Sequence, residues 1–158
     1  MTGIAQFHVG IVVADLESAM AELSSLLGLT FNEPRTVYFN RLEDPDPREA
    51  DIRVVFSKEG PPHYELMQGG PGTVYENFPL GLHHVGVWQR DAQAKLDDFA
   101  ARGIPFESRV VMPDGRALSW FNDPDSILGV RFEFVDDADR PTLENFMRTG
   151  EYEGEFRV

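Results

Sequence analysis

Two histidines and two glutamates stand in otherwise apolar segments of this chain, and together they could hold a metal ion. His8 and His84 each precede a Val-Gly pair, while Glu65 and Glu133 lie within the segments HYELM and RFEFV. Neutral imidazoles and carboxylates suit a divalent transition metal such as Ni, Co, Zn, Fe or Mn. Burying two carboxylates close together without a cation is costly, so convergence of the four side chains predicts a metal site.

Each of these residues has a simpler interpretation when it is taken alone. A glutamate in an alternating strand commonly faces solvent, and a lone histidine on an apolar strand is more often a hydrogen-bonded core residue than a ligand. The balance changes because the order His then Glu occurs twice, with a similar separation, in two similar halves of the chain. The metal interpretation therefore depends on the duplication.

The duplication is visible when FHVGIVVADLESAMAELSSLLGLTF (7–31) is written above HHVGVWQRDAQAKLDDFAARGIPF (83–106). Each copy begins with an apolar strand pattern and reaches an aspartate, Asp15 or Asp91, that suits a helix N-cap. A segment with apolar residues at helical spacing follows, and Gly28 or Gly103 suits the left-handed position that ends a helix. Each copy therefore predicts a strand followed by a helix.

Three β-rich segments follow each predicted helix, and turn sequences rich in Pro, Gly and Asp separate them. The segments are 35–40, 51–57 and 63–67 in the first copy and 107–112, 117–121 and 129–135 in the second. The chain thus predicts an α+β fold in one domain, 1–158, with two paired βαβββ modules (4–67 and 81–136) that form a curved mixed-sheet cleft. We expect residues 137–158 to be a peripheral tail, or to pack across a partner subunit.

The doublet in GLHHVGVW (81–88) raises a question of direction. Successive side chains of a strand point to opposite faces, so His84 is expected to face the cleft and His83, which aligns with Phe7, to point away. The same alternation places Gly86 and Trp88 on the face of His84, where Gly86 would leave room for a ligand.

Composition narrows the classes of protein that fit. The chain has 158 residues, 42 % of them hydrophobic, and carries a net charge of −13 without any cysteine. This acidity disfavours nucleic-acid binding, and the lack of cysteine excludes thiolate ligands and disulfides. With no apolar run of 18 residues and no signal-peptide pattern, we expect no membrane association and a cytoplasmic location.

The motifs FHVGIVVADL (7–16), YELM (64–67), GLHHVGVW (81–88) and NDP…GVRFEF (122–134) resemble those of the vicinal oxygen chelate superfamily. This superfamily includes glyoxalase I, methylmalonyl-CoA epimerase, extradiol dioxygenases and bleomycin-resistance proteins, and the resemblance covers roughly residues 4 to 136. It implies paired βαβββ modules and the metal ligands His8, Glu65, His84 and Glu133. It also makes a homodimer the expected assembly.

The resemblance does not select one reaction. The set His, Glu, His, Glu matches glyoxalase I, whereas the epimerases usually have Gln at the position of Glu65 and a second catalytic Glu within the segment equivalent to RTVYFN (35–40). An Fe(II) dioxygenase would use two His and one Glu, but single-chain extradiol enzymes are about twice as long. A binding or resistance protein of the same fold is the alternative to an enzyme, although bleomycin-resistance proteins lack these ligands.

The chemistry implied by the resemblance is proton abstraction beside a metal-chelated carbonyl. A small substrate would present two vicinal oxygens, and Glu133 or Glu65 would remove a proton to give an enediolate or enolate, with an isomerase, epimerase or lyase outcome. The aromatic residues on the same strands favour an apolar or ring-bearing substrate. The residues predicted to contact it are Tyr38, Trp88, Arg116, Trp120 and Phe121.

Overall fold

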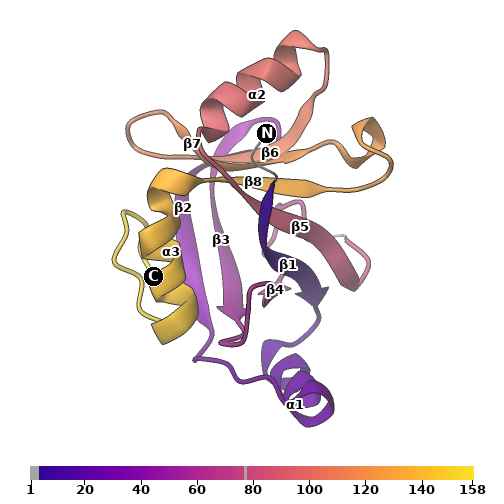
Figure 1. The fold of residues 1–158 in the computed structure, drawn as a ribbon, viewed down its shortest axis with the longest axis vertical. Coiled ribbons are helices and arrows are strands. Elements are labelled where there is room, and N and C mark those ends of the chain that lie inside the picture. Colours follow the sequence, from indigo (N-terminus) through magenta and orange to yellow (C-terminus); the bar gives the residue numbers. More distant parts are fainter. Residues whose placement is uncertain (1–3, 77) are drawn as a thin grey trace.

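Eight strands close into one barrel in a computed structural model that describes residues 4–76 and 78–158 (Figure 1). Around the barrel the strand order is β1-β4-β3-β2-β6-β7-β8-β5. The strands are β1 (Ala5–Val13), β2 (Arg35–Glu43), β3 (Pro47–Phe56), β4 (His63–Gln68), β5 (Gly81–Gln89), β6 (Phe106–Val111), β7 (Ala117–Asn122) and β8 (Phe132–Asp136). The helices are α1 (Leu16–Leu27), α2 (Ala92–Ala101) and α3 (Arg140–Thr149), with short 3-10 turns at η1 (Pro124–Ser126) and η2 (Asp137–Asp139).

The barrel consists of two halves with the same topology. Strand β1 pairs in parallel with β4, and β5 pairs in parallel with β8, while the other strands within each half are antiparallel. The halves join along β1 and β5, and again where Leu42 and Glu43 of β2 pair with Val110 and Arg109 of β6. The predicted α+β fold is confirmed, and the sheet that was expected to form a cleft closes on itself.

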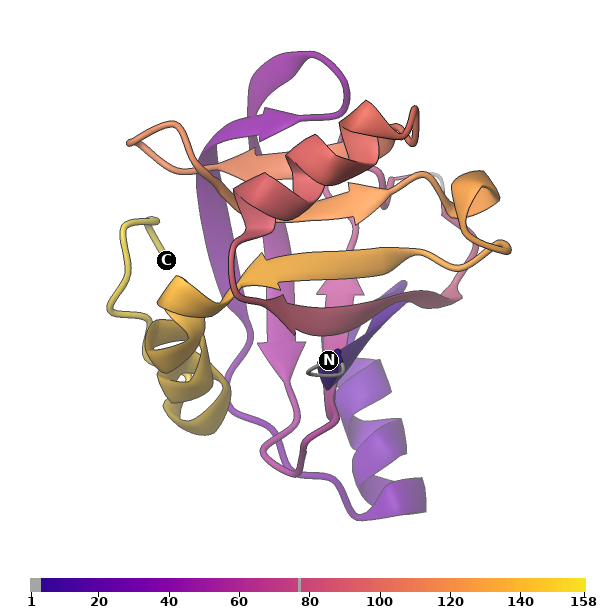
Figure 2. The same cartoon turned by 45° about the horizontal axis from the view of Figure 1, so that its top comes forward.

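Helices α1 and α2 lie on the outside of the barrel and are placed by similar caps (Figure 2). Asp15 accepts a hydrogen bond from the backbone N–H of Ser18, and Asp91 accepts one from Ala94, as the predicted N-caps should. Leu16 buries one side of α1 against β3 and β4, and Leu96 does the same for α2 against β7 and β8. The caps and the apolar faces together hold the two helices outside the sheet.

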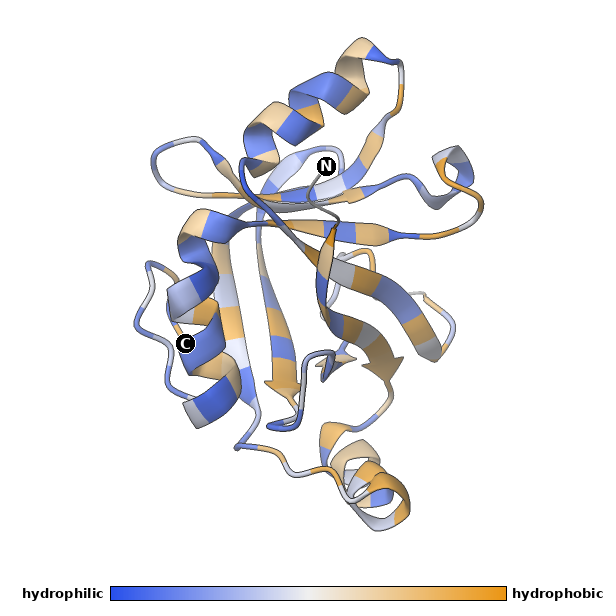
Figure 3. Cartoon of the chain, viewed as in Figure 1, coloured by the Kyte–Doolittle hydropathy of each residue, from blue (hydrophilic) through white to orange (hydrophobic). Residues whose placement is uncertain are grey.

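Polar and apolar residues alternate along several strands (Figure 3), so that successive side chains divide between an outer layer and the barrel interior. Phe132 and Phe134 of β8 pack toward α2, which turns the intervening Glu133 inward. The aromatic neighbours that made Glu133 look like an exposed residue of an alternating strand are therefore the outer layer. The glutamate is the inward residue.

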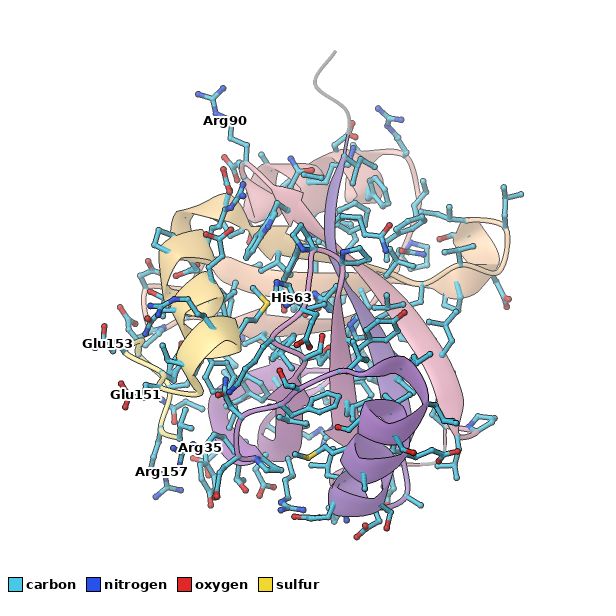
Figure 4. The ribbon with its side chains drawn as sticks, turned by 60° about the horizontal axis from the view of Figure 1, so that its bottom comes forward. Arg35, His63, Arg90, Glu151, Glu153 and Arg157 are labelled. Atoms are coloured by element: carbon cyan, nitrogen blue, oxygen red, sulfur yellow. The ribbon has the colours of Figure 1, made fainter. Side chains whose placement is uncertain are left out.

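The C-terminal segment belongs to the core, contrary to the expectation of a peripheral tail. Phe146 and Phe156 are buried with residues of β2, β3 and β6, and Met147 packs beside Trp88. The segment runs back along β2, where Arg35 donates to the carbonyl of Gly150; Figure 4 shows Arg35 beside this segment. Burial of these three apolar side chains outweighs the polar character of the tail sequence.

Among the helices formed by residues 4–76 and 78–158, none is both long enough and apolar enough to cross a membrane.

Candidate metal centre

Four side chains from four strands converge inside the barrel: His8 (β1), Glu65 (β4), His84 (β5) and Glu133 (β8). One nitrogen or oxygen of each residue lies within 4.8 Å of those of the other three. The Nε2 atoms of His8 and His84 are 2.7 Å apart. The structure therefore brings together the four residues that the sequence predicted as one cluster.

The carboxylates lie against both imidazoles rather than against one each. Oε2 of Glu65 is 3.3 Å from Nε2 of His8 and 3.1 Å from that of His84, and Oε2 of Glu133 is 3.1 Å and 3.4 Å from the same atoms. Each module contributes one histidine and one glutamate, so the cluster needs both halves of the chain.

The glycines of the two His-Val-Gly motifs explain how the imidazoles fit. In the antiparallel pairing of β1 with β5, His8 lies opposite Gly86 and His84 opposite Gly10. A Cβ on Gly10 would lie 2.0 Å from Cε1 of His84, and one on Gly86 would lie 1.9 Å from Cε1 of His8. Gly86 was expected to leave room for a ligand; instead, each glycine makes room for the histidine of the other module.

A β-bulge precedes each of these histidines and breaks the alternation. The pairing of β1 with β5 skips Phe7 between Gln6 and His8, and it skips His83 between Leu82 and His84. Consequently Phe7 and His83 are as buried as the residues that follow them. The matching bulges agree with the alignment of His83 with Phe7, and His83 lies outside the four-residue cluster, although it is buried. Its Nδ1 lies 3.0 Å from Nδ1 of His84.

The charges of the cluster stabilise one another in the absence of a metal. Burial alone would lower the pKa of His8, but Glu65 and Glu133 raise it from 6.5 to about 9. Burial would likewise raise the pKa of Glu133, but its interactions with His8 and His84 bring that pKa far below its ordinary value. The two carboxylates thus favour the charged form of His8.

A divalent cation fits this set of donors. Two imidazole nitrogens and two carboxylates are ligands for transition metals, and the two negative charges offset the charge of the ion. Ligand atoms about 2.1 Å from one ion lie roughly 3 Å apart when they are adjacent, which agrees with the separations of 2.7 to 3.4 Å that involve the histidines. Oε2 of Glu65 is buried and forms no hydrogen bond within residues 4–76 and 78–158.

A cavity of about 110 Å³ lies next to the cluster and is mostly apolar. His8, Glu65 and Glu133 form its polar end. Its walls come from β1, β2, β3, β6 and β7, from the loop before β5 and from the C-terminal segment. They include Phe7, Val37, Phe39, Leu42, Ile52, Val54, Phe56, Tyr75, Ser108, Arg109, Ser119, Phe121, Leu143, Phe146, Met147, Tyr152 and Phe156.

The residues predicted to contact a substrate are only partly at this cavity. Phe121 and Trp120 contribute to its wall, although the indole of Trp120 packs against Phe134 and donates to the carbonyl of Ala92. Trp88 lies behind Phe7, whose ring stacks on it at a centroid distance of 3.7 Å.

The other two predicted substrate contacts lie outside the cavity wall. Tyr38 alternates with the inward Val37 and Phe39, and the guanidinium of Arg157 lies over its ring. Arg116 pairs with Asp139, with Nη1 to Oδ2 at 2.6 Å. Both residues therefore have structural partners, and neither can be a cavity contact in this arrangement.

Sequence reasoning missed Tyr75 and the C-terminal aromatic residues. Tyr75 is buried in the loop before β5, and its pKa is raised well above the ordinary value by burial and by the charges of Glu133 and Glu65. Because loops carry no alternating pattern, neither spacing nor periodicity could identify it. Phe146, Tyr152 and Phe156 could have been found from the apolar character of PTLENFM and the aromatic residues after it.

Strand β2 contains an acid that the predicted segment 35–40 did not include. Glu43 lies at its end and is buried, but it pairs with Arg109 and Arg41 and does not line the cavity. These ion pairs account for its burial at the place where β2 meets β6. Within residues 4–76 and 78–158, the acids that line the cavity are Glu65 and Glu133.

Comparison with protein families places this chain. The model of the glyoxalase/bleomycin resistance protein/dioxygenase superfamily matches residues 7–119, which is most of the sequence. The chain therefore belongs to this superfamily, also known as the vicinal oxygen chelate superfamily. A comparison with curated protein sequences finds no match.

Solved structures with the same fold include methylmalonyl-CoA epimerases. The Mycobacterium tuberculosis enzyme is 21 % identical, with a TM-score of 0.62, and the match covers 88 % of this chain and 91 % of that one. A variant of the Streptomyces coelicolor epimerase in complex with 2-nitronate-propionyl-CoA is 16 % identical (TM-score 0.61; 86 % and 99 %). A hypothetical protein from Bacillus halodurans C-125 is 18 % identical (TM-score 0.60; 86 % and 96 %). At these identities the likeness concerns the fold.

Proposed function

We propose that this protein is a divalent-metal-dependent enzyme that moves a proton next to a carbonyl group, with an isomerase, epimerase or lyase outcome. The observation that carries the proposal is the convergence of two histidines and two glutamates from both modules at the polar end of an apolar cavity. His8, Glu65, His84 and Glu133 would hold Ni, Co, Zn, Fe or Mn. The bound ion would supply a Lewis acid for two vicinal oxygens of the substrate.

Side chains of the protein would supply the base and would exclude water from the reacting carbon. Glu133 is the better candidate for the base, because both glutamates line the cavity and the side chain of Glu133 is 16 % exposed against 10 % for Glu65. A carboxylate at the end of an apolar cavity can take the proton and return it to a neighbouring carbon or to the opposite face. Phe56, Phe121 and Tyr75 would keep water from the reacting carbon.

The cavity favours a small apolar or ring-bearing substrate with vicinal oxygens. Its volume of about 110 Å³ is of the order of the roughly 150 Å³ apolar cavity that binds benzene in another protein. The epimerase neighbours bind CoA compounds, so an acyl thioester with a compact acyl group belongs in the panel to be tested. We further propose that the protein is cytoplasmic and forms a homodimer. Light scattering can test the dimer.

Proton exchange in heavy water tests the proposed reaction. The metal-saturated protein should catalyse deuterium incorporation at the α-carbon of an apolar 2-hydroxy acid, 2-keto acid or thioester, and Glu133→Gln should abolish it at saturating metal. Glu22→Gln, on an exposed part of α1, is the matched control and should keep full exchange. A protein that binds the ligand panel but takes up no metal would instead be a binding protein of this fold, and the proposal would be wrong.

A further inference from the structure

His83 lies against the nitrogen of His84 that faces away from the cluster. Nε2 of His84 is 3.1 Å from Glu65 and 3.4 Å from Glu133, while its Nδ1 is 3.0 Å from Nδ1 of His83. His83 comes into this position through the bulge in β5, which leaves both rings buried. The second half of the chain thus has two buried histidines in contact.

We propose that His83 is a positioning residue that fixes the tautomer and the orientation of His84. In this arrangement Nδ1–H of His84 donates to the bare Nδ1 of His83, and Nε2 of His84 is left without a proton and turned toward the cluster. The inference rests on the proposed function, since it concerns how the candidate metal ligand is prepared.

The proton arrangement follows from the chemistry of imidazole. Two ring nitrogens can form a hydrogen bond only when one of them carries a proton and the other does not. A histidine that binds a metal through Nε2 has no proton there, so its remaining proton is on Nδ1. The bond between the two Nδ1 atoms then requires His83 to be neutral, with its proton on Nε2.

The surroundings of His83 keep its ring in place. Its ring lies edge-on to Tyr75, Phe78 and Phe121, at centroid distances of 4.8, 4.5 and 5.5 Å. Arg131 donates from Nη1 to the backbone carbonyl of His83 at 3.2 Å. These contacts hold the ring of His83 with its Nδ1 against Nδ1 of His84.

The first half of the chain has a different residue at the position equivalent to His83, and this difference shows what His83 adds. Phe7 occupies the equivalent bulge before His8, and Nδ1 of His8 has no hydrogen-bond partner within residues 4–76 and 78–158. A phenyl ring is therefore accepted at this bulge by the same fold. His83→Phe would give the second half the arrangement of the first, with its volume and burial nearly kept.

Metal affinity is the measurement that tests the proposal. Calorimetric titration of metal-free His83→Phe with Zn²⁺ should show binding that is 10- to 100-fold weaker than in the wild type, the usual effect of losing such a supporting group. His83→Asn keeps an acceptor oxygen near the position of Nδ1 and should recover affinity to within about fivefold. Phe78→Leu, which changes a ring beside His83 but leaves the acceptor, should bind Zn²⁺ like the wild type.

The outcomes separate this inference from the proposed function. A wild type that binds no Zn²⁺ would refute the metal centre itself. Wild-type affinity in His83→Phe would refute the role of His83 and leave the metal centre intact. If that variant fails to fold, long-range ¹H–¹⁵N spectra of the Zn²⁺-loaded wild type still decide: the proposal requires the proton of His84 on Nδ1 and that of His83 on Nε2. The reverse assignment at either ring overturns it.

Discussion

The two halves of the barrel supply the same pair of candidate ligands but surround them differently. In the first half Phe7 stands before His8, and β2 and β3 line the cavity with Phe39 and Phe56. In the second half His83 stands before His84, and β6 and β7 contribute the small polar residues Ser108 and Ser119. The duplicated topology thus brings the candidate ligands together, while the residues that surround them differ between the two halves.

The difference separates what the metal site requires from what each half adds to it. The glycine opposite each histidine is common to both halves, so making room for the imidazoles is a requirement of the shared geometry. Phe39 and Phe56 of the first half and Phe121 of the second half all line the cavity, whereas a buried histidine directly before the candidate ligand occurs only in the second half, at His83.

Removing either histidine should have the largest effect, and the same effect in both halves. We expect His8→Ala and His84→Ala each to weaken Zn²⁺ binding by roughly 1000-fold, since a four-ligand site distributes about 10–16 kcal/mol over its ligands. Calorimetric titration of the metal-free proteins measures this. His63→Ala is the control, because its ring bonds to the carbonyl of Ser57 instead. Retention of wild-type affinity by one of the two variants would show that the halves do not share one ion.

The C-terminal segment that lines the cavity (143–156) should matter for stability and not for metal binding. Phe146 packs against Phe56 of the first half and against Tyr152, and it is almost fully buried. Phe146→Ala should lower the free energy of unfolding by about 3 kcal/mol, measured by urea denaturation. Zn²⁺ affinity should stay within threefold of the wild type. Leu26→Ala, at an exposed site on α1, is the matched control and should change stability by less than about 0.5 kcal/mol.

Filling the space beside the histidines tests the shared part of the geometry. A methyl group at Gly10 would collide with the ring of His84, and one at Gly86 would collide with that of His8. Gly10→Ala and Gly86→Ala should each lower stability by about 1–3 kcal/mol and move one imidazole, which should weaken Zn²⁺ binding roughly tenfold. Thermal unfolding and metal titration check both effects. Similar losses at the two sites support the two-fold arrangement, and a neutral outcome at either site argues against it.

The pKa of His8 predicts how metal uptake depends on pH. Because the folded metal-free protein holds this pKa at about 9, Zn²⁺ must displace a proton at neutral pH, and affinity should rise about tenfold between pH 7 and pH 8. The raised pKa stabilises the metal-free fold fully below pH 6.5, and this contribution is lost as pH rises through about 9. Titrations at several pH values give the slope, and a flat profile would contradict the ion-pair network.

The strands, the capped helices and the four converging side chains could be predicted from the sequence because the two halves repeat the same order of residue types. His8 with His84 and Glu65 with Glu133 could be matched without coordinates, and the turn residues marked most strand ends. Alternation failed at Phe7 and His83, because a bulge depends on the pairing of two strands that are far apart in sequence.

Substrate contacts were the least predictable part of the site. Tyr38 and Arg116 look available in the sequence, but Arg157 and Asp139 engage them in the fold. Tyr75 and Phe146 lie in a loop and in the tail, where no period identifies the inward face. Closure of the barrel through the short pairing of β2 with β6 is likewise a tertiary contact that no local pattern encodes.

Anomalous diffraction tests the central claim most directly. Crystals of the protein grown with Zn²⁺ or Co²⁺ and measured at the absorption edge of that metal should show one strong peak per chain. We expect that peak between Nε2 of His8, Nε2 of His84 and the carboxylates of Glu65 and Glu133. Crystals that show no peak among these four side chains, or an ion bound at another place only, would contradict the account.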